Sequence, residues 1–559
     1  MLDNSLVNKK IELQGLRKSA VEISQTRLLV VGFLFAIFFI VLAGRAVDLI
    51  LINDEKFVHL TKKENVENQK NRSDIVDRNG VLLATSIDSV SLYANPKIIF
   101  DKGDVSEKLS KIFEDMSAEK ISKLLSYERS FVYIKRQITP MQHEEINKLG
   151  IPGLSFHRES KRVFPLGSLT SHITGYTNID NRGLAGIERN FDVDLRQKKL
   201  PVELTIDVRV QHALRDELLI AINKFSALGG AGIVMNVNTG EIMAMVSLPD
   251  FNPNVKGNPK SNERFNRATL GIYEMGSTFK AFTIGAALHF GVAGFSDEYD
   301  ASKPIKISRH IIRDSHPKKR WLSVPEIFQH SSNIGAASLA KDIGNVRQKE
   351  FLEKLGLLHS PIIQIPEVGK PLKPSSWRQI NTMTIGFGHG IAVSLLQVAS
   401  AYAILVNGGK KIYPNFVLDS VKKPQEQILS SEVSYKLRNL LRLVVTSGTA
   451  TKANAKGYLV GGKTGTAEKP GVGGYQSQAL ISSFVGVFPI NKPEFLVVVM
   501  LDEPKGTKET FNHAGAGWTA APTVGKIIPR IAPILSVFPS IEKNEREKLK
   551  ATTVSVRDN

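Results

Sequence analysis

The first apolar pattern in the chain is a continuous run near its N-terminus. Leu28 to Gly44 contain no charged side chain and are rich in Val, Leu, Ile and Phe. As a helix this run is roughly 25 Å long. Its length approaches the roughly 30 Å thickness of a bilayer's hydrocarbon core if the next residues extend the helix and the Arg45 side chain snorkels to the interface. Lys and Arg precede the run, so we expect residues 1–27 in the cytoplasm and a transmembrane anchor over residues 28–50. A cleavable signal peptide is the alternative, although the run exceeds the usual length of about 7–15 apolar residues.

Beyond the anchor, mixed strand and helix patterns extend to about residue 225. Asn79-Gly80 separates two apolar runs, which is the signal of a β-hairpin turn. Residues 101–150 combine charged positions with spaced Leu and Ile in short helical patterns. These patterns predict an α+β domain.

From Gly229 the pattern changes to short, nearly continuous apolar segments. Residues 231–237 and 241–246 flank the turn Asn238-Thr239-Gly240 and predict a hairpin. Strands at both ends of this region with helices between them predict a sheet whose terminal segments pair, covered by helices. The later elements predicted are strands over 481–488 and 495–501 and helices over 395–406 and 431–445.

Composition and charge exclude some classes of protein but do not identify the function. A chain of 559 residues is long enough for two or three domains. The formal charge of +19 is compatible with nucleic acid, an anionic membrane or an anionic polymer, but Lys and Arg are scattered and no nucleic-acid motif accompanies them. The absence of cysteine excludes disulfides, thiolate metal sites and a cysteine nucleophile.

A candidate nucleophile lies at the start of an apolar segment. Ser277 follows Gly276, and residues 277–290 predict a buried helix whose free N–H groups favour developing negative charge at the serine. Lys280 lies one turn on, on the same face. It can accept the serine proton only if burial and neighbouring cations lower its pKa until the amine is neutral. The alternative is an ordinary N-cap serine beside a solvated lysine.

A second string, Ser331-Ser332-Asn333, precedes a predicted helix of small residues. It could be no more than a serine N-cap. In a catalytic role, Ser331 would relay a proton to a leaving amine, while Asn333 would hold the substrate amide and orient Lys280.

The third string is Lys463-Thr464-Gly465-Thr466, after a predicted strand edge. Lys463 and the hydroxyls of Thr464 and Thr466 are candidates to bind a carboxylate, and Gly465 would let a ligand backbone lie along the edge as an added strand. The N–H groups of Thr466 and Ser277 could form an oxyanion hole. A strand that simply ends in a turn is the alternative for this string alone.

Together and in this order, S-x-x-K, S-x-N and K-T-G are typical of penicillin-binding proteins and class A β-lactamases. The chain resembles the class B penicillin-binding proteins, and within them the cell-division type, penicillin-binding protein 3 of Gram-negative bacteria. Further strings that carry the resemblance are Arg72 to Gly80, with Ser73 in place of the usual Gly, Arg162 to Gly167, Gly183 to Glu188, Pro249 to Asn254 and Gly386 to Gly390.

The resemblance implies an α+β architecture in three parts. These are a single N-terminal transmembrane helix, an elongated α+β pedestal of the dimerisation type over residues 51–225, and a penicillin-binding transpeptidase domain over residues 226–535. The last would have a central antiparallel sheet covered by helices, like the serine β-lactamases. Residues 536–559 are expected to form a flexible tail.

The resemblance also implies a peptidoglycan D,D-transpeptidase that cross-links stem pentapeptides at the division septum, releases D-alanine and is inhibited by β-lactams. Ser277, Lys280, Ser331 and Asn333 would be catalytic, and residues 463–466 would bind substrate, with no metal and no cofactor. The expected partners are a division-specific membrane glycan polymerase and other divisome proteins, but no nucleic acid. The expected location is the inner membrane at the division site, with a cytoplasmic N-terminus and a periplasmic catalytic domain.

Several other classes share part of this pattern. An elongation-specific class B transpeptidase is the nearest alternative. A serine β-lactamase needs neither a membrane anchor nor an N-terminal domain of about 200 residues, a β-lactam sensor usually has several membrane spans, and a division scaffold without activity would tolerate decay of the three motifs.

Overall fold

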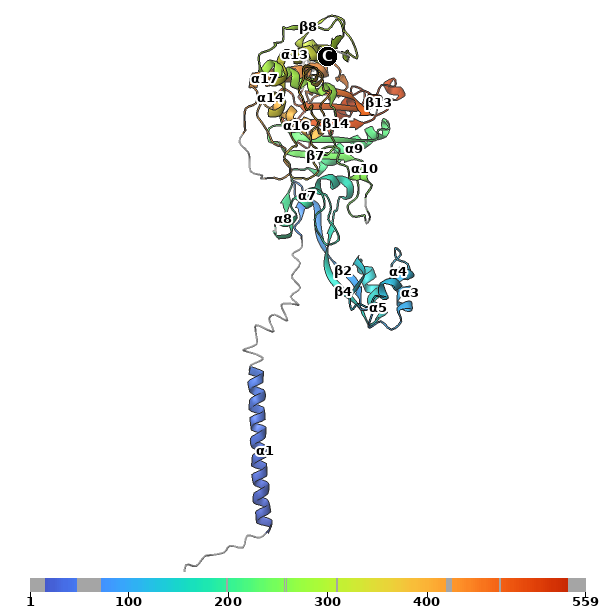
Figure 1. The fold of residues 1–559 in the computed structure, drawn as a ribbon, viewed down its shortest axis with the longest axis vertical. Coiled ribbons are helices and arrows are strands. Elements are labelled where there is room, and N and C mark those ends of the chain that lie inside the picture. The colour runs from blue at the N-terminus through green and yellow to red at the C-terminus, as the bar shows by residue number, and fades with distance from the viewer. Residues whose placement is uncertain are drawn as a thin grey trace, which may run out of the picture. The chain divides into compact units, whose positions relative to one another are not determined.

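The computed structural model describes residues 16–47, 72–197, 200–255, 257, 259–307, 310–418, 425–471 and 474–540. It divides into two units, before and after the boundary between residues 70 and 71. The first unit contains the helix α1 (Leu16–Val47). Its segment Arg27–Arg45 is apolar between the two arginines and none of it is buried, and the helix is long and apolar enough to cross a membrane (Figure 1). The predicted anchor lies in α1 as far as Val47, whereas residues 48–50, the first residues of the expected pedestal (51–71) and most of the expected tail lie outside the described residues.

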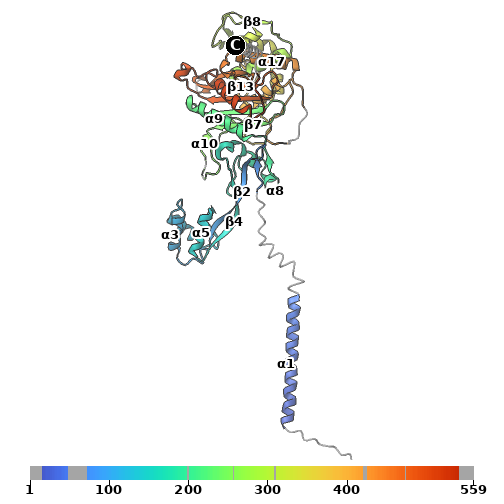
Figure 2. The same cartoon turned by 180° about the vertical axis from the view of Figure 1, so that it is seen from behind.

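The second unit begins with a sheet built on the long strand β2 (Leu82–Ala94), which pairs with β4 (Leu154–Val163) as an antiparallel ribbon. At its start β2 pairs with β1 (Ile75–Val76), and Gly80 in the turn between them has a φ of +80°. This confirms the predicted hairpin. In both views the helices α3 and α5 lie at the end of the ribbon remote from the rest of the second unit, and Figure 1 shows α4 beside them (Figure 1, Figure 2). The other elements here are α3 (Lys102–Ile112), α4 (Ala118–Leu125), β3 (Val132–Ile138), α5 (Pro140–Leu149), α6 (Ser171–Thr174), α7 (Gly186–Asn190), α8 (Asp192–Gln197) and β5 (Val202–Glu203).

The other five-stranded sheet of the second unit is antiparallel, with the strand order β12-β13-β14-β6-β7. The chain returns after more than two hundred residues to place β14 beside β6, with Phe495 opposite Asn236. The predicted pairing of the two terminal segments is therefore confirmed, and β12 is left at an edge of the sheet. The strands are β6 (Gly229–Asn236), β7 (Ile242–Leu248), β12 (Gly461–Gly471), β13 (Gly474–Phe488) and β14 (Phe495–Asp502).

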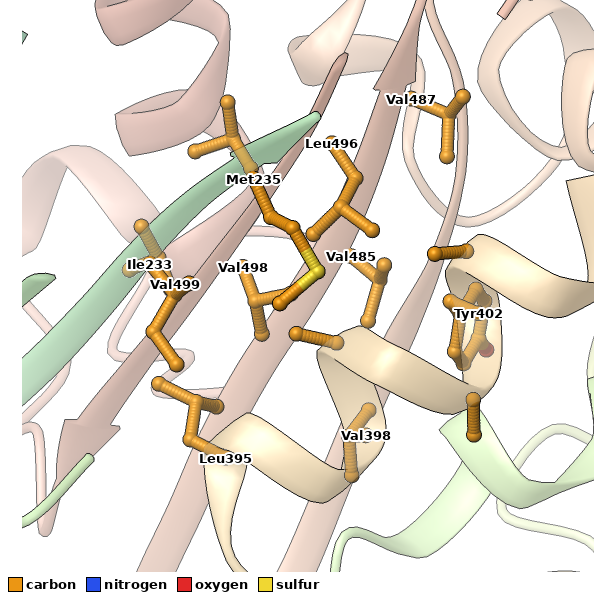
Figure 3. Packing of buried hydrophobic residues seen from close by; sticks show 14 of the residues in the cluster. Ile233, Met235, Leu395, Val398, Tyr402, Val485, Val487, Leu496, Val498 and Val499 are labelled. Carbon is orange, nitrogen blue, oxygen red and sulfur yellow. The ribbon is translucent and has the colours of Figure 1, made fainter. Parts of the chain in front are cut away.

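Helices cover both faces of this sheet. Met235 of β6 faces α16 (Leu395–Val406), whose Leu395 and Val398 are seen packing against the strands in Figure 3. Three positions earlier on the same strand, a Cβ atom on Gly232 would lie 2.8 Å from Leu214 of α9 (Val208–Lys224). Because side chains alternate between the faces of a strand, α9 and α16 lie on opposite faces.

The remaining helices and strands complete the covering layers and the loops near the sheet edge. The predicted helices over 395–406 and 431–445 are both confirmed. These elements are α10 (Ser261–Arg264), α11 (Lys280–His289), β8 (Glu298–Asp300), β9 (Ile305–Ile307), β10 (His310–Ile312), β11 (Trp321–Ser323), α12 (Val324–His330), α13 (Asn333–Ile343), α14 (Asn345–Lys354), α15 (Gln379–Ile385), α17 (Ser431–Ser447) and α18 (Ala520–Ile531). The boundaries expected at residues 225 and 535 stay predictions.

Candidate active site

Ser277 lies in a one-turn 3₁₀ helix, Gly276–Phe279, directly before α11. The predicted buried helix is confirmed, with its first turn wound more tightly than an α-helix. Tyr402 of α16 holds this turn, because its buried hydroxyl donates a hydrogen bond of 2.7 Å to the carbonyl oxygen of Thr278. The serine is thus fixed at the start of a helix that is buried along most of its length.

Lys280 connects Ser277 to the second motif. Its side chain is fully buried, and its Nζ atom lies 2.9 Å from Ser277 Oγ, 2.6 Å from the carbonyl oxygen of Ser331 and 2.7 Å from Asn333 Oδ1. Ser331 Oγ is a further neighbour at 3.0 Å. Carbonyl oxygens can only accept hydrogen bonds. A neutral amine that donates its two hydrogens to the two carbonyl oxygens therefore keeps its lone pair for the hydroxyl hydrogen of Ser277.

The environment of Lys280 favours that neutral amine. Burial lowers the pKa of Lys280 well below its usual value, and the charge of Lys463 lowers it further, while Asp314 opposes the shift. Burial disfavours the charged form of a lysine because the ammonium loses its hydration. The sequence analysis required burial and a neighbouring cation for Lys280 to accept the serine proton, and the structure has both.

The loop that carries the second motif is shaped by local backbone conformation. Ser331 ends α12 with a left-handed backbone, at a φ of +57°. Ser332 then caps α13, because its Oγ atom accepts a hydrogen bond of 3.0 Å from the N–H of Gly335. The prediction that this motif holds an N-cap serine is thus confirmed for Ser332. The side chains of Ser331 and Asn333 instead contact Lys280.

Asp314 is a site residue that the sequence analysis missed. Its Oδ1 atom accepts hydrogen bonds from the backbone N–H groups of Asn333 at 2.5 Å and Ile334 at 2.9 Å, and its Oδ2 atom accepts one from Ser332 Oγ at 2.8 Å. It therefore fixes the first turn of α13 and the residue that contacts Lys280. No motif surrounds Asp314, and only the fold brings it to this helix.

Lys463, predicted to bind a carboxylate, is buried in the structure. It lies on β12, its side chain is fully buried, and its Nζ atom lies 3.0 Å from Ser331 Oγ and 3.2 Å from the carbonyl oxygen of Thr464. Burial lowers the pKa of Lys463 to about 7. Lys463 and Lys280 thus contact the same serine hydroxyl from two sides, which gives a path for proton transfer.

The two threonines of the third motif have different surroundings. Thr464 is buried, and its Oγ1 atom shares a hydrogen bond of 2.7 Å with Thr449 Oγ1. Thr466 is exposed, and its Oγ1 atom accepts a hydrogen bond of 3.0 Å from the N–H of Ala516. Thr466 is therefore the more accessible candidate for contact with a substrate, and the oxyanion hole stays a prediction.

Gly465 is needed for a contact that the sequence analysis did not anticipate. A Cβ atom at this position would lie 2.4 Å from the carbonyl oxygen of Met275, and one on Gly276 would lie 2.7 Å from the carbonyl oxygen of Thr466. Gly276 also has a φ of +52°, which disfavours any side chain. The two glycines let β12 and the Ser277 turn approach each other, so the turn itself lies against Gly465, where a ligand backbone was expected.

A buried imidazole borders this cluster. His389 Nδ1 is buried and has no hydrogen-bond partner among the described residues. Burial lowers the pKa of His389 to about 4, and the charge of Lys280 contributes to the shift. The ring is therefore neutral at pH 7, and its edge contact with Tyr475 has a centroid separation of 5.5 Å.

Family models match two parts of the chain. Residues 230–528 match the penicillin binding protein transpeptidase domain, which includes all three motifs. Residues 67–210 match the penicillin-binding protein dimerisation domain.

Three relatives illustrate the similarity along the chain. A probable peptidoglycan D,D-transpeptidase FtsI of Caulobacter vibrioides is 38% identical over 83% of this chain and 82% of its own length. The probable peptidoglycan D,D-transpeptidase PenA of Neisseria meningitidis is 31% identical over 84% of this chain and 85% of its own length. The peptidoglycan D,D-transpeptidase FtsI of Escherichia coli is 29% identical over 85% of this chain and 86% of its own length.

Solved structures support the fold. A peptidoglycan synthetase from Bifidobacterium adolescentis superposes with a TM-score of 0.67 and 22% identity, over 85% of this chain and 97% of that structure. A putative peptidoglycan glycosyltransferase from Atopobium parvulum superposes with a TM-score of 0.66 and 23% identity, over 84% of this chain and 99% of that structure.

Proposed function

The chain belongs to the class B penicillin-binding proteins of the cell-division type, and we propose that Ser277 carries the acyl group in its reaction. It is a membrane-anchored, serine-type peptidoglycan D,D-transpeptidase that binds peptidoglycan stem peptides and β-lactams. The observation that carries the proposal for Ser277 is the 2.9 Å contact between its Oγ atom and the Nζ atom of a fully buried lysine, Lys280.

In the first step the Nζ atom of neutral Lys280 takes the hydroxyl proton of Ser277, and Oγ attacks the carbonyl carbon between the two terminal D-alanines. The carbonyl π electrons move to oxygen, where N–H groups of Ser277 and Thr466 would stabilise the negative charge. As the tetrahedral intermediate collapses, the C–N bond breaks. The departing amine receives the proton from Lys280 through Ser331, and D-alanine leaves.

In the second step an amine of a neighbouring stem peptide attacks the acyl-serine. The amine loses a proton to Lys280, the new C–N bond forms, and the C–Oγ bond of Ser277 breaks. Ser277 then regains its proton from Lys280, which closes the cycle without a metal or an organic cofactor. Asn333 positions Lys280 in both steps through its side-chain oxygen.

Recognition of the donor would use the third motif. Protonated Lys463 together with Thr464 and Thr466 would bind the carboxylate that ends the donor peptide, while Gly465 keeps β12 close to Ser277. β-Lactams carry an amide and a carboxylate in a similar arrangement, so they would acylate Ser277 and remain attached.

The cellular setting is part of the proposal. Positive charge before the apolar run favours an inner-membrane location with residues 1–27 in the cytoplasm and the catalytic region in the periplasm. The similarity to FtsI-type relatives favours action at the division site with a membrane glycan polymerase and other divisome proteins, rather than in elongation.

Two measurements test the proposed function. Purified full-length protein should release D-alanine from a pentapeptide donor and join that donor to an amine acceptor, and Ser277→Ala should do neither. Depletion in the cell should give filaments, because septal cross-linking would stop. Rounded cells would instead indicate the elongation role.

A further inference from the structure

Between α11 and α12 the chain forms two small antiparallel pairs, β9 with β10 and β8 with β11. We name the described part of this segment, residues 298–307 and 310–323, the basic lobe. Its inner side packs on α12 and α13, because Ile312 shares a buried apolar cluster with Ile327 and Ile334. The basic lobe is therefore a fixed part of the fold beside the second motif.

The exposed surface of the basic lobe carries an excess of positive charge. Its charged residues are Lys303, Lys306, Arg313, Lys318, Lys319 and Arg320, against Glu298, Asp300 and Asp314. Arg320 forms an ion pair of 2.6 Å with Glu326 of α12. Arg313, Lys318 and Lys319 are exposed, and none of them forms an ion pair with another residue that the structure describes. These three cations are available to an anionic partner.

The basic lobe adjoins the catalytic cluster through Arg313. The carbonyl oxygen of Arg313 accepts a hydrogen bond of 3.0 Å from Asn333 Nδ2. The Oδ1 atom of Asn333 lies 2.7 Å from Lys280 Nζ, which in turn lies 2.9 Å from Ser277 Oγ. The next residue, Asp314, uses its carboxylate for the first turn of α13. Three short contacts thus connect Arg313 to the nucleophile.

Lys318 lies near the other end of the same motif. Burial lowers the pKa of His330, the residue before Ser331, and the charge of Lys318 lowers it further. A charge shifts a pKa in this way when it is close to the titrating group. Lys319 follows with a left-handed backbone, at a φ of +56°. Exposed cations of the basic lobe therefore flank the second motif at both Asn333 and His330.

The position of the basic lobe disfavours a membrane surface as its partner. The described part of the second unit begins at Arg72, which contacts α8 through an ion pair of 2.7 Å with Asp192. In both views β13 and β7 lie between α8 and β8 along the vertical axis (Figure 1, Figure 2). The basic lobe is thus remote from the point where the chain enters this unit.

The acceptor of the second step has the charge that the basic lobe requires. It is a stem peptide of the same polymer as the donor, so it too ends in a carboxylate. The donor loses its own terminal carboxylate with D-alanine before the acceptor attacks. The acceptor amine must then reach the acyl-serine and lose a proton to Lys280, close to the basic lobe. Cations beside a reacting centre attract an anionic ligand and raise its rate of association.

We propose that Arg313, Lys318 and Lys319 of the basic lobe bind the carboxylate groups of the acceptor stem peptide and concentrate it at the acyl-serine. The inference rests on the proposed transpeptidase function. It concerns the second step alone, since the donor carboxylate is assigned to Lys463.

The first experiment compares two acceptor peptides with the same attacking amine, one with free carboxylates and one with every carboxylate amidated. Full-length protein acylated with one donor is mixed with subsaturating acceptor, and the second-order rate constant for cross-linking is measured. Exposed ion pairs are individually weak, so three of them predict that the free acceptor reacts about tenfold faster at low salt. The ratio of the two rate constants should approach one at about 1 M salt, where the Debye length is about 3 Å.

The second experiment measures the same ratio in a variant of the basic lobe and in a matched control. The lobe variant combines Arg313→Gln, Lys318→Gln and Lys319→Asn, with Asn chosen because it tolerates the left-handed backbone. The control removes the same charge from exposed positions in and after α4, through Arg129→Gln, Lys120→Gln and Lys123→Gln. The ratio at low salt should fall toward one in the lobe variant and stay at about tenfold in the control.

The ratio separates charge recognition from structural damage, because a defect in folding or in chemistry slows both acceptors alike. A ratio of one in the wild type at low salt, or an undiminished ratio in the lobe variant, would show that the inference is wrong. The measurement is then repeated in bilayers with and without anionic lipid. A ratio that falls toward one only in the anionic bilayer would assign the basic lobe to the membrane surface and would also overturn the inference.

The first step keeps this inference distinct from the proposed function. Wild-type protein that forms no penicillin adduct and releases no D-alanine would overturn the proposed function and the inference with it. A penicillin adduct and D-alanine release, together with equal rate constants for the two acceptors at low salt, would overturn the inference alone.

Discussion

The Nζ atom of Lys463 lies 3.0 Å from the Oγ atom of Ser331, a residue 132 positions earlier in the chain. The contact connects the edge strand β12 to the loop before α13. Lys280 reaches the same hydroxyl from the other side at 3.0 Å. Two buried lysines thus share one serine, and the charge of Lys463 lowers the pKa of Lys280.

The first prediction concerns the pH dependence of acylation. The pKa of Lys463 is lowered to about 7, so its ammonium form is present below that pH and is lost above it. The second-order rate constant for acylation by a carboxylate-bearing β-lactam should therefore fall above pH 7, by up to roughly tenfold per pH unit. Lys463→Arg, which stays charged, should lack this fall.

The control is the methyl ester of the same β-lactam. Because the ester has no negative charge to bind, its rate should not fall above pH 7 in the wild type. The same fall with the ester, or in Lys463→Arg, would mean that another group titrates.

The second prediction identifies the nucleophile. Intact-protein mass spectrometry after treatment with penicillin should show one covalent adduct in the wild type and none in Ser277→Ala. Ser360→Ala, at an exposed position, should keep the adduct. An adduct on the Ser277→Ala protein would place the nucleophile elsewhere.

The third prediction concerns Asp314 as a positioning residue. Asp314→Asn keeps an oxygen that can accept hydrogen bonds from the backbone of α13, but it removes the charge that raises the pKa of Lys280. Lys280 should then become neutral at lower pH, so the acidic limb of the acylation profile should shift to lower pH. Asp314→Ala should also destabilise the protein by about 1–3 kcal/mol, because two backbone N–H groups lose their acceptor. If Asp314 had only a structural role, the acidic limb of the acylation rate against pH would not move in Asp314→Asn.

The fourth prediction tests the close approach of β12 to the Ser277 turn. Gly465→Ala places a Cβ atom 2.4 Å from the backbone oxygen of Met275, so one of the two segments must move. A displacement of about 1 Å at a catalytic serine can cost roughly a hundredfold in rate. We expect penicillin acylation to slow by about that factor, as measured by stopped-flow or gel assay. Gly294→Ala, where the nearest atom is a side-chain oxygen at 3.8 Å, should have little effect.

The fifth prediction concerns a buried ion-pair network outside the active site. Glu188 is fully buried and forms ion pairs with Arg72 and with Arg162, the latter at 2.7 Å. Removing one partner leaves buried charge uncompensated, so Glu188→Ala should lower the free energy of unfolding by about 3–5 kcal/mol in chemical denaturation. Asp104→Ala breaks an exposed pair with Lys108 and should cost less than about 1 kcal/mol. Equal effects of the two variants would show that the network contributes little.

The sequence by itself determined what depends on local spacing. The apolar run in α1, the turn at Asn79-Gly80 and the helix of α16 follow from periodicity and turn chemistry within a few residues. The same is true of Ser277 and Lys280, because residues three apart in a helical turn share a face. The order of the three motifs then indicated the family.

Only the tertiary structure decided how the site works. The lowered pKa values of Lys280 and Lys463 arise from burial, and burial depends on which distant segments cover each amine. Asp314 accepts hydrogen bonds from the first turn of a helix that begins nineteen positions later, and Gly465 matters because the Met275 backbone packs against it. Desolvation and close packing are properties of segments that meet in space, so no local pattern in the chain encodes them.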